Sequence, residues 1–172
     1  MIRDIEIVTP APAGSLHGNR ITALRWQRFL KALHYRSTVS EQWSGQACDL
    51  LIALHGLRSY DSIQRFKDAH PDRPLVLIMT GTDIYRDLQG SPKVVMSMEA
   101  SDAIVVLQPA AMNALPEGFH RKVQVIYQSV KAPKRKNPPA QAFWPLLLAI
   151  FGLKKILFAQ SKVFLFCALK AG

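Results

Sequence analysis

Acidic residues and cysteines are scarce in this chain of 172 residues. No Asp or Glu occurs from Ala11 through Ser40, and the net charge of the whole chain is +10. The two cysteines, Cys48 and Cys167, form no C-x-x-C pair and no metal-ligand spacing. We therefore expect free thiols in a reducing compartment, a cytoplasmic protein and no bound metal. Because Asp4 and Glu6 precede any long apolar run, we expect no signal peptide.

Several ligand-binding motifs are also absent. The chain has neither G-x-G-x-x-G nor G-x-x-x-x-G-K-[ST], so no dinucleotide or P-loop fingerprint applies. It has no G-x-S-x-G nucleophile motif. Basic residues are not interleaved with aromatic residues in a repeat, and we expect no nucleic-acid partner.

Short apolar runs alternate with helical patterns along the first 130 residues. The runs 50–54 and 75–79 are continuously apolar, as in strands buried on both faces of a parallel sheet. Further strands are expected at 5–9, 36–39, 103–107 and 123–127, and helices at 21–33, 59–69, 94–100 and 109–115, with Ser59 as an N-cap. The predicted fold class is α/β, with a Rossmann-like parallel sheet and helices on both faces.

The composition changes after the predicted domain of residues 1–130. Residues 131–140 are basic and rich in proline, which is typical of a linker, and residues 141–172 form an apolar and basic tail. The apolar stretch Phe143–Leu153 is shorter than the roughly 20 residues that span a bilayer. A tail that packs on the domain or stays mobile is the simpler interpretation, and a helix on a membrane surface is the alternative.

Polar and glycine residues follow three of the predicted strands. The carboxyl ends of parallel strands share one edge of a sheet, where α/β proteins bind ligands. Arginine side chains and the N–H groups of a helix start suit a phosphate-like anion. An alternative is that the first of these segments, 10–20, is only a surface loop. The predicted anion-binding residues are Gly14, Ser15, Gly18, Asn19, Arg20, Arg58, Thr80, Gly81, Thr82 and Arg86.

Two titratable residues at this edge are candidates for a catalytic role. Asp83 follows one buried strand and could accept a proton, or it could hold Arg86 or a backbone turn in place. His55 directly follows another buried strand, and the alternative is a hydrogen-bonded packing residue.

Five segments, taken together and in their order along the chain, form a pattern that is specific enough to compare with known families. They are Thr9–Ser15 with Gly18–Arg20, Thr22–Trp26, Cys48–His55, His70–Leu75 and Thr80–Leu88. Together they resemble the N-terminal domain of a GT-B-fold glycosyltransferase of the family-4 type. Within that family the resemblance points to the selenosugar synthases of selenoneine biosynthesis.

The resemblance implies transfer of a sugar from a UDP-sugar, such as UDP-N-acetylglucosamine, to selenophosphate. It implies that this domain holds the acceptor, and that catalysis occurs in the cleft to a second domain that holds the nucleotide sugar. The partners are then small-molecule substrates, with the UDP-sugar as co-substrate and no bound cofactor. The anion-binding residues above are assigned to the acceptor.

The chain departs from this family after the linker. The second domain should open near Phe143, but Phe143–Gly152 keeps only a suggestion of its first strand and turn. We therefore expect residues 141–172 to be a truncated or aberrant remnant, and the chain to be an incomplete enzyme. The alternative is a non-catalytic anion-binding α/β module, or a basic domain that contacts membrane or nucleic acid.

Overall fold

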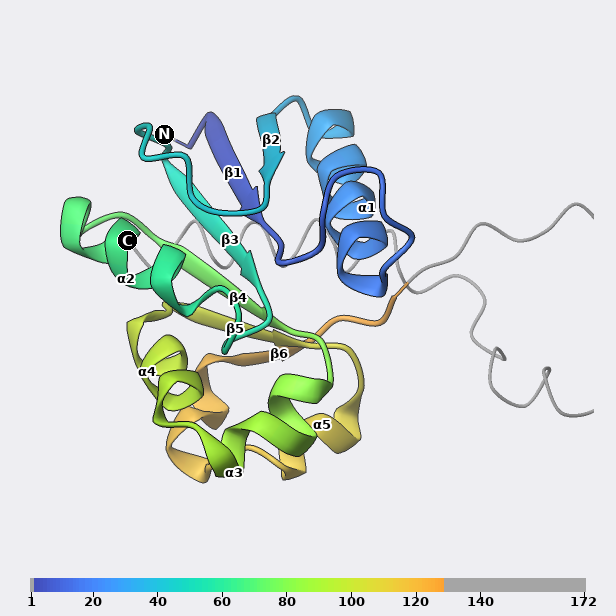
Figure 1. The fold of residues 1–172 in the computed structure, drawn as a ribbon, viewed down its shortest axis with the longest axis vertical. Helices are drawn as coiled ribbons and strands as arrows, with labels where there is room; N and C mark the ends of the chain where they lie inside the picture. Colours follow the sequence, from blue (N-terminus) through green and yellow to red (C-terminus); the bar gives the residue numbers. More distant parts are fainter. Residues whose placement is uncertain (1, 129–172) are drawn as a thin grey trace, which may run out of the picture.

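A computed structural model describes residues 2–128, which form a six-stranded parallel sheet between two layers of helices (Figure 1). The strand order is β2-β1-β3-β4-β5-β6. The strands are β1 (Asp4–Val8), β2 (Arg36–Ser40), β3 (Leu50–Leu54), β4 (Leu75–Met79), β5 (Ala103–Val106) and β6 (Val123–Val125). The α/β, Rossmann-like fold class predicted from the sequence is confirmed.

Helix α1 covers one face of the sheet, and α2, α4 and α5 cover the other (Figure 1). The helices are α1 (Gly18–Ala32), α2 (Tyr60–Ala69), α3 (Leu88–Gly90), α4 (Pro92–Ala100) and α5 (Pro109–Asn113). Two further turns are η1 (Asp83–Asp87), a π-helix, and η2 (Glu117–Lys122), a 3₁₀ helix. Helices therefore lie on both faces, as expected from the alternating pattern.

The chain reverses direction across the sheet at β1. Ile7 pairs with Val39 of β2 on one side and with Ile52 of β3 on the other. From β3 onward each new strand is added outward, so β4, β5 and β6 follow in order. The loops after β1 and β3 diverge at such a reversal, and the crevice outside them is where open α/β sheets bind ligands.

The core is built from the two faces of the central strands. Every residue of β3 and β4 is buried, which explains why both segments are continuously apolar. On one face Leu77 packs with Phe66 of α2 and Met98 of α4. On the other face Ile52 packs with Ala23 and Leu30 of α1. The sheet is therefore a rigid base for the loops at its carboxyl edge.

Two local expectations are corrected by the structure. The hydroxyl of Ser59 does not cap α2, because it donates to the carbonyl of Leu54 at 2.6 Å and is thus used to fix the turn after β3. Helix α1 begins at Gly18 rather than at Ile21, so Gly18, Asn19 and Arg20 form its first turn. The predicted linker 131–140 and the tail 141–172 lie outside the described residues.

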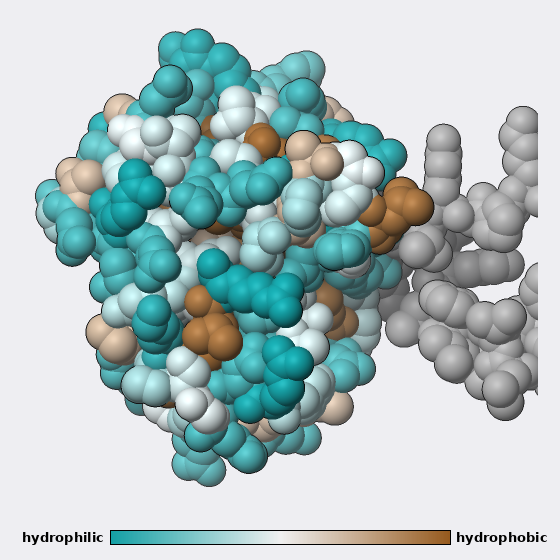
Figure 2. All heavy atoms as spheres, viewed as in Figure 1, coloured by the Kyte–Doolittle hydropathy of each residue, from teal (hydrophilic) through white to brown (hydrophobic). Residues whose placement is uncertain are grey.

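In the view of Figure 2 most of the surface is hydrophilic, and the hydrophobic side chains that reach it are separated from one another. None of the helices within residues 2–128 is long and apolar enough to cross a lipid bilayer.

Truncating Leu77 tests the central position of β4. Leu77 is fully buried between α2 and α4, so Leu77→Ala should lower the free energy of unfolding by about 2 to 5 kcal/mol, through lost burial and a residual cavity. Leu24→Ala, on the exposed side of α1, is the matched control and should change it by less than about 0.5 kcal/mol. Urea unfolding measures both, and equal losses would contradict this packing.

Candidate functional site

The turn after β3 is packed against α4. His55 adopts a left-handed backbone with φ of +74°, which lets the chain leave β3 and enter α2 within a few residues. A Cβ placed on Gly56 would lie 3.4 Å from Cγ1 of Val94, and Ser97 Oγ donates to the Gly56 carbonyl at 2.7 Å. The lack of a side chain at Gly56 therefore permits this close approach.

Asp83 joins this turn to the end of β4. Its Oδ1 accepts hydrogen bonds from the backbone N–H groups of Thr80 and Gly81, both at 2.9 Å. Its Oδ2 accepts from the backbone N–H of Gly56 at 3.0 Å, and the side chain is fully buried. Three backbone donors therefore converge on one carboxylate, which suits a group that positions two loops.

His55 lies beside Asp83 and is itself almost fully buried. The backbone N–H of Arg58 donates to His55 Nδ1 at 3.4 Å, so the proton of the neutral ring is on Nε2. Nε2 is 2.9 Å from Thr82 Oγ1, which accepts that proton in a hydrogen bond. Burial lowers the pKa of His55, although the negative charge of Asp83 acts in the opposite direction. The ring is thus held neutral and oriented from both nitrogens.

Asp87 is a member of this cluster that the sequence analysis missed. Its Oδ2 is 3.7 Å from His55 Nε2, is buried and has no hydrogen-bond partner among the described residues. Arg86 donates from Nε to Asp87 Oδ1 at 2.7 Å and holds the pKa of the Asp87 carboxyl below its usual range. The four-residue spacing of Asp83 and Asp87 places both carboxylates on the buried side of η1, a signal that becomes visible only once a helical turn is assigned there.

The other predicted anion-binding residues lie between β1 and the first turn of α1. Gly14 and Ser15 belong to the loop, and Gly18, Asn19 and Arg20 form the first turn of the helix. Gly14 has φ of +78°, a conformation that favours glycine. Helix α1 starts with no side-chain cap and no acidic residue in its first turn. Its first N–H groups are therefore available to an anion.

Three polar atoms between the end of β1 and the first turn of α1 are buried without a hydrogen-bond partner among the described residues. They are Thr9 Oγ1, Ser15 Oγ and Arg20 Nε. Buried polar atoms are normally paired, because leaving one unpaired costs about 1 to 3 kcal/mol. A ligand that accepts from Ser15 and Arg20 would satisfy two of them.

The predicted residues thus fall into two groups at the carboxyl edge of the sheet. His55, Thr80, Gly81, Thr82 and Asp83 are joined directly by hydrogen bonds. Arg58 adds only its backbone to that group, and its side chain is exposed, while Arg86 is paired with Asp87. No hydrogen bond within residues 2–128 joins this group to the β1–α1 loop, so a ligand between them would have to bridge β1 with β3 and β4.

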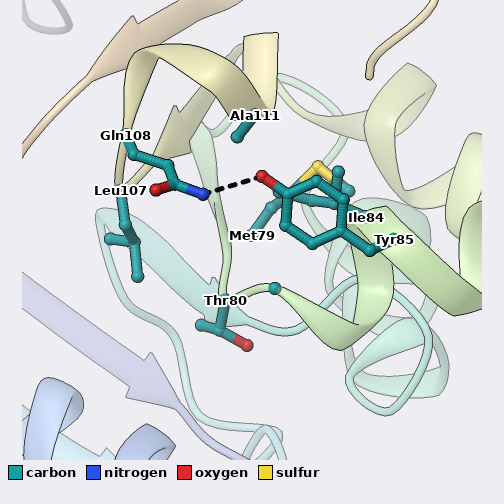
Figure 3. Close-up of a pocket in the computed structure, with 8 residues that line it drawn as sticks. Met79, Thr80, Ile84, Tyr85, Leu107, Gln108 and Ala111 are labelled. Atoms are coloured by element: carbon teal, nitrogen blue, oxygen red, sulfur yellow. Dashed lines mark hydrogen bonds between the residues drawn. The ribbon is translucent and has the colours of Figure 1, made fainter. Parts of the chain in front are cut away.

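A small hollow of about 230 Å³ opens between the ends of β4 and β5 (Figure 3). Gln108 Nε2 donates to the Tyr85 hydroxyl at 2.8 Å, so these two side chains meet across the hollow from opposite walls. The sequence analysis did not single out either residue. The hollow is lined by Met79, Thr80, Gly81, Ile84, Tyr85, Leu107, Gln108 and Ala111, none of which is charged.

Cys48 is a buried free thiol, and burial raises its pKa to about 11. The thiol is therefore protonated at neutral pH and is not an activated nucleophile. The part of the chain that the structure describes contains no group of His, Cys, Asp or Glu residues arranged to hold a metal ion.

Comparison with known proteins found no family model that matches the chain and no match among curated proteins.

Replacing Asp83 tests its positioning role. Asp83→Asn exchanges one acceptor oxygen for an amide donor that faces backbone N–H groups, so the free energy of unfolding should fall by about 2 to 4 kcal/mol. Asp87→Asn is the matched control, since Oδ2 of Asp87 has no hydrogen-bond partner among the described residues and Oδ1 still accepts from Arg86; we expect a loss below about 1 kcal/mol. Thermal and urea unfolding measure both. An unchanged free energy of unfolding in Asp83→Asn would contradict the positioning role of Asp83.

The burial of neutral His55 predicts a pH-dependent stability. An unfolded histidine takes up a proton near pH 6.5, whereas the folded pKa is lower, so stability is complete above about pH 6.5 and falls as the pH decreases. The slope from this one group is at most about 1.4 kcal/mol per pH unit. Asp83, Asp87 and Arg58 are the charged groups that face the ring.

His55→Asn should reduce this slope, because asparagine stays neutral and tolerates a positive φ. His34→Asn is the control, since His34 is also at positive φ, 65°, but is exposed. Urea unfolding at about pH 7.5 and about pH 5.5 measures the difference. An unchanged slope in His55→Asn would show that the ring is not the group that titrates.

Proposed function

We propose that residues 2–128 are the acceptor-binding half of a glycosyltransferase that uses a UDP-sugar as donor and selenophosphate as acceptor. The sequence resemblance to GT-B enzymes of the family-4 type supports this proposal. The observation that carries it is the pair of polar groups at the carboxyl edge of the sheet. Ser15 Oγ in the β1–α1 loop and Arg20 Nε at the start of α1 are buried donors without a hydrogen-bond partner among the described residues, and Asp83 joins the ends of β3 and β4.

The uncapped start of α1 and the Arg20 guanidinium suit the phosphate part of the acceptor. In the proposed reaction the selenium atom forms a bond to the anomeric carbon of the sugar. The bond from that carbon to UDP breaks, and the electron pair leaves with UDP. The role of the described residues is to bind and orient the selenium nucleophile, because the UDP-sugar is held by a second domain in enzymes of this type.

His55 and Asp83 have different roles in this proposal. Asp83 positions the loops, because all of its hydrogen bonds within the described residues go to backbone donors. The neutral ring of His55 is hydrogen-bonded to the hydroxyl of Thr82, a residue that is exposed at the edge of the sheet. His55 can therefore influence the acceptor through the Thr82 hydroxyl.

One observation favours the alternative, a non-catalytic anion-binding module. Asp83 is fully buried and accepts hydrogen bonds from three backbone N–H groups, and only 1% of the surface of His55 is exposed. Neither residue therefore reaches solvent directly in this structure, as a catalytic base that contacts its substrate must. In this alternative the β1–α1 loop binds an anion, and the protein catalyses no transfer of a sugar.

The acceptor site is tested by a titration with inorganic phosphate in which calorimetry measures the affinity. Arg20→Gln removes a charged donor and should weaken phosphate binding by about tenfold or more. Arg3 lies before β1, at the opposite edge of the sheet, so the control variant Arg3→Gln should leave the phosphate affinity unchanged. Equal affinity in Arg20→Gln would contradict an anion site at α1.

Catalysis is tested separately, with the whole chain, UDP-N-acetylglucosamine and freshly made selenophosphate. Mass spectrometry then detects any sugar that carries selenium. A selenium-containing sugar supports the glycosyltransferase proposal. Phosphate binding without product supports the non-catalytic module, or an acceptor half that is inactive without a donor domain. Binding to any polyanion with no preference for phosphate would support neither.

A further inference from the structure

The outer surface of α1 exposes large apolar side chains. Ile21, Leu24 and Phe29 are 40%, 39% and 40% exposed, respectively. These are three of the seven large hydrophobic residues found exposed within the described residues, and all three belong to one helix of 15 residues. The opposite side of α1 buries Ala23 and Leu30 against the sheet, so Ile21 and Leu24 are not needed for the core. Phe29 is seven residues after the buried Thr22 and so lies at the edge of the exposed surface.

Basic residues are interleaved with these apolar side chains. Ile21, Leu24 and Arg28 follow one another at spacings of three and four, which places them in one row along the helix. Arg25 and Lys31 lie beside this row. In the view of Figure 2 hydrophobic and hydrophilic side chains alternate over the region of α1 and the loop before it.

The cations of this surface lack acidic partners. No acidic residue occurs from Ala11 through Ser40, and none of the ion pairs within residues 2–128 involves Arg25, Arg28 or Lys31. Arg25 donates to the neutral side chain of Gln128 at 2.6 Å. The pKa of Arg25 is lowered first by partial burial and then by the nearby charge of Arg28, so the two guanidinium groups repel each other.

The segment after β6 extends the same surface. Gln128 contacts both Arg25 and Thr22 of α1, and its neighbour Tyr127 is 36% exposed. An exposed aromatic residue with a polar tip therefore directly precedes the residue that contacts α1. Tyrosine is well suited to the boundary between water and a lipid phase.

We propose that the outer face of α1, formed by Ile21, Leu24, Arg25, Arg28, Phe29 and Lys31, binds the surface of a lipid bilayer that contains anionic head groups. Cations attract the head groups, and apolar side chains enter the boundary of the acyl chains. A nucleic acid would use the cations and the ring of Phe29, because aliphatic side chains such as Ile21 and Leu24 offer no stacking surface to bases. The combination of the two kinds of side chain favours lipid, and it is independent of the proposed acceptor site.

The test is sedimentation of the whole chain with vesicles. Binding is expected to vesicles of phosphatidylcholine mixed with phosphatidylglycerol, and much less to phosphatidylcholine alone. Arg28→Gln should weaken binding about fivefold, since each basic residue near an anionic surface raises the affinity by about that factor. Lys93→Gln, at an exposed lysine on α4, is the matched control and should bind like the parent chain.

A second pair of variants tests the apolar component. Ile21→Gln combined with Leu24→Gln should weaken vesicle binding by roughly tenfold while the chain stays folded, because both side chains are exposed. Met96→Gln, at a comparably exposed apolar residue of α4, should have no effect.

The proposal is overturned if the whole chain does not sediment with anionic vesicles, or if the α1 variants bind as well as the controls. It is also overturned if the double variant keeps its affinity while duplex DNA competes with the vesicles, which would identify a general polyanion site. Circular dichroism of each variant separates a loss of binding from a loss of folding.

Discussion

The arrangement of the carboxyl edge depends on one buried carboxylate that receives three backbone N–H groups. Asp83 draws the turn after β3 and the turn after β4 toward each other, at N–O distances of 2.9 to 3.0 Å. A charge buried in this way is stable only when it is well paired with donors, and here the donors belong to the main chain. The position of His55, the start of η1 and the conformation of Gly81 all follow from this contact.

The same contact limits the chemistry that can occur nearby. Because Asp83 is fully buried and accepts three backbone hydrogen bonds, the reactive potential of the edge lies with groups that still have free hydrogen-bonding capacity. Within residues 2–128 they include the Thr82 hydroxyl, Oδ2 of Asp87, Ser15 Oγ and Arg20 Nε. They face an edge that is flanked by an uncharged hollow on the β5 side. The geometry thus separates a charged region near α1 from an apolar one near α5.

Much of the fold could be predicted from the sequence because the hydrophobic pattern is unambiguous in the centre of the sheet. The bounds of β3 and β4 follow directly from two continuous apolar runs. Strand β6 is shorter than predicted, since Ile126 and Tyr127 continue the apolar pattern after strand pairing has ended at Val125. The convergence of His55 and Thr82 could also be predicted, because parallel strands end at the same edge.

The partners of Asp83 could not be predicted from residue types. Backbone N–H groups are present at every non-proline position, so the sequence does not show which of them a carboxylate will meet. The π-helical turn η1 was missed for a related reason: its residues Asp83–Asp87 are mostly polar and have no clear apolar period, and Asp87 went unnoticed with it. The exposed row on α1 was overlooked because an apolar stripe on the opposite side, including Ala23 and Leu30, already accounts for the helix.

The place of β1 in the sheet has a consequence for how the chain is made. Asp4–Val8 is synthesised before β2 to β6, yet it lies between β2 and β3 and pairs with residues as distant as Leu50–Ala53. A nascent chain must therefore expose the β3-facing edge of β1 until those residues are available. During that interval the strand is a template for pairing with other chains. The proline residues Pro10 and Pro12, directly after it, prevent the apolar strand from extending further and so keep this vulnerable segment short.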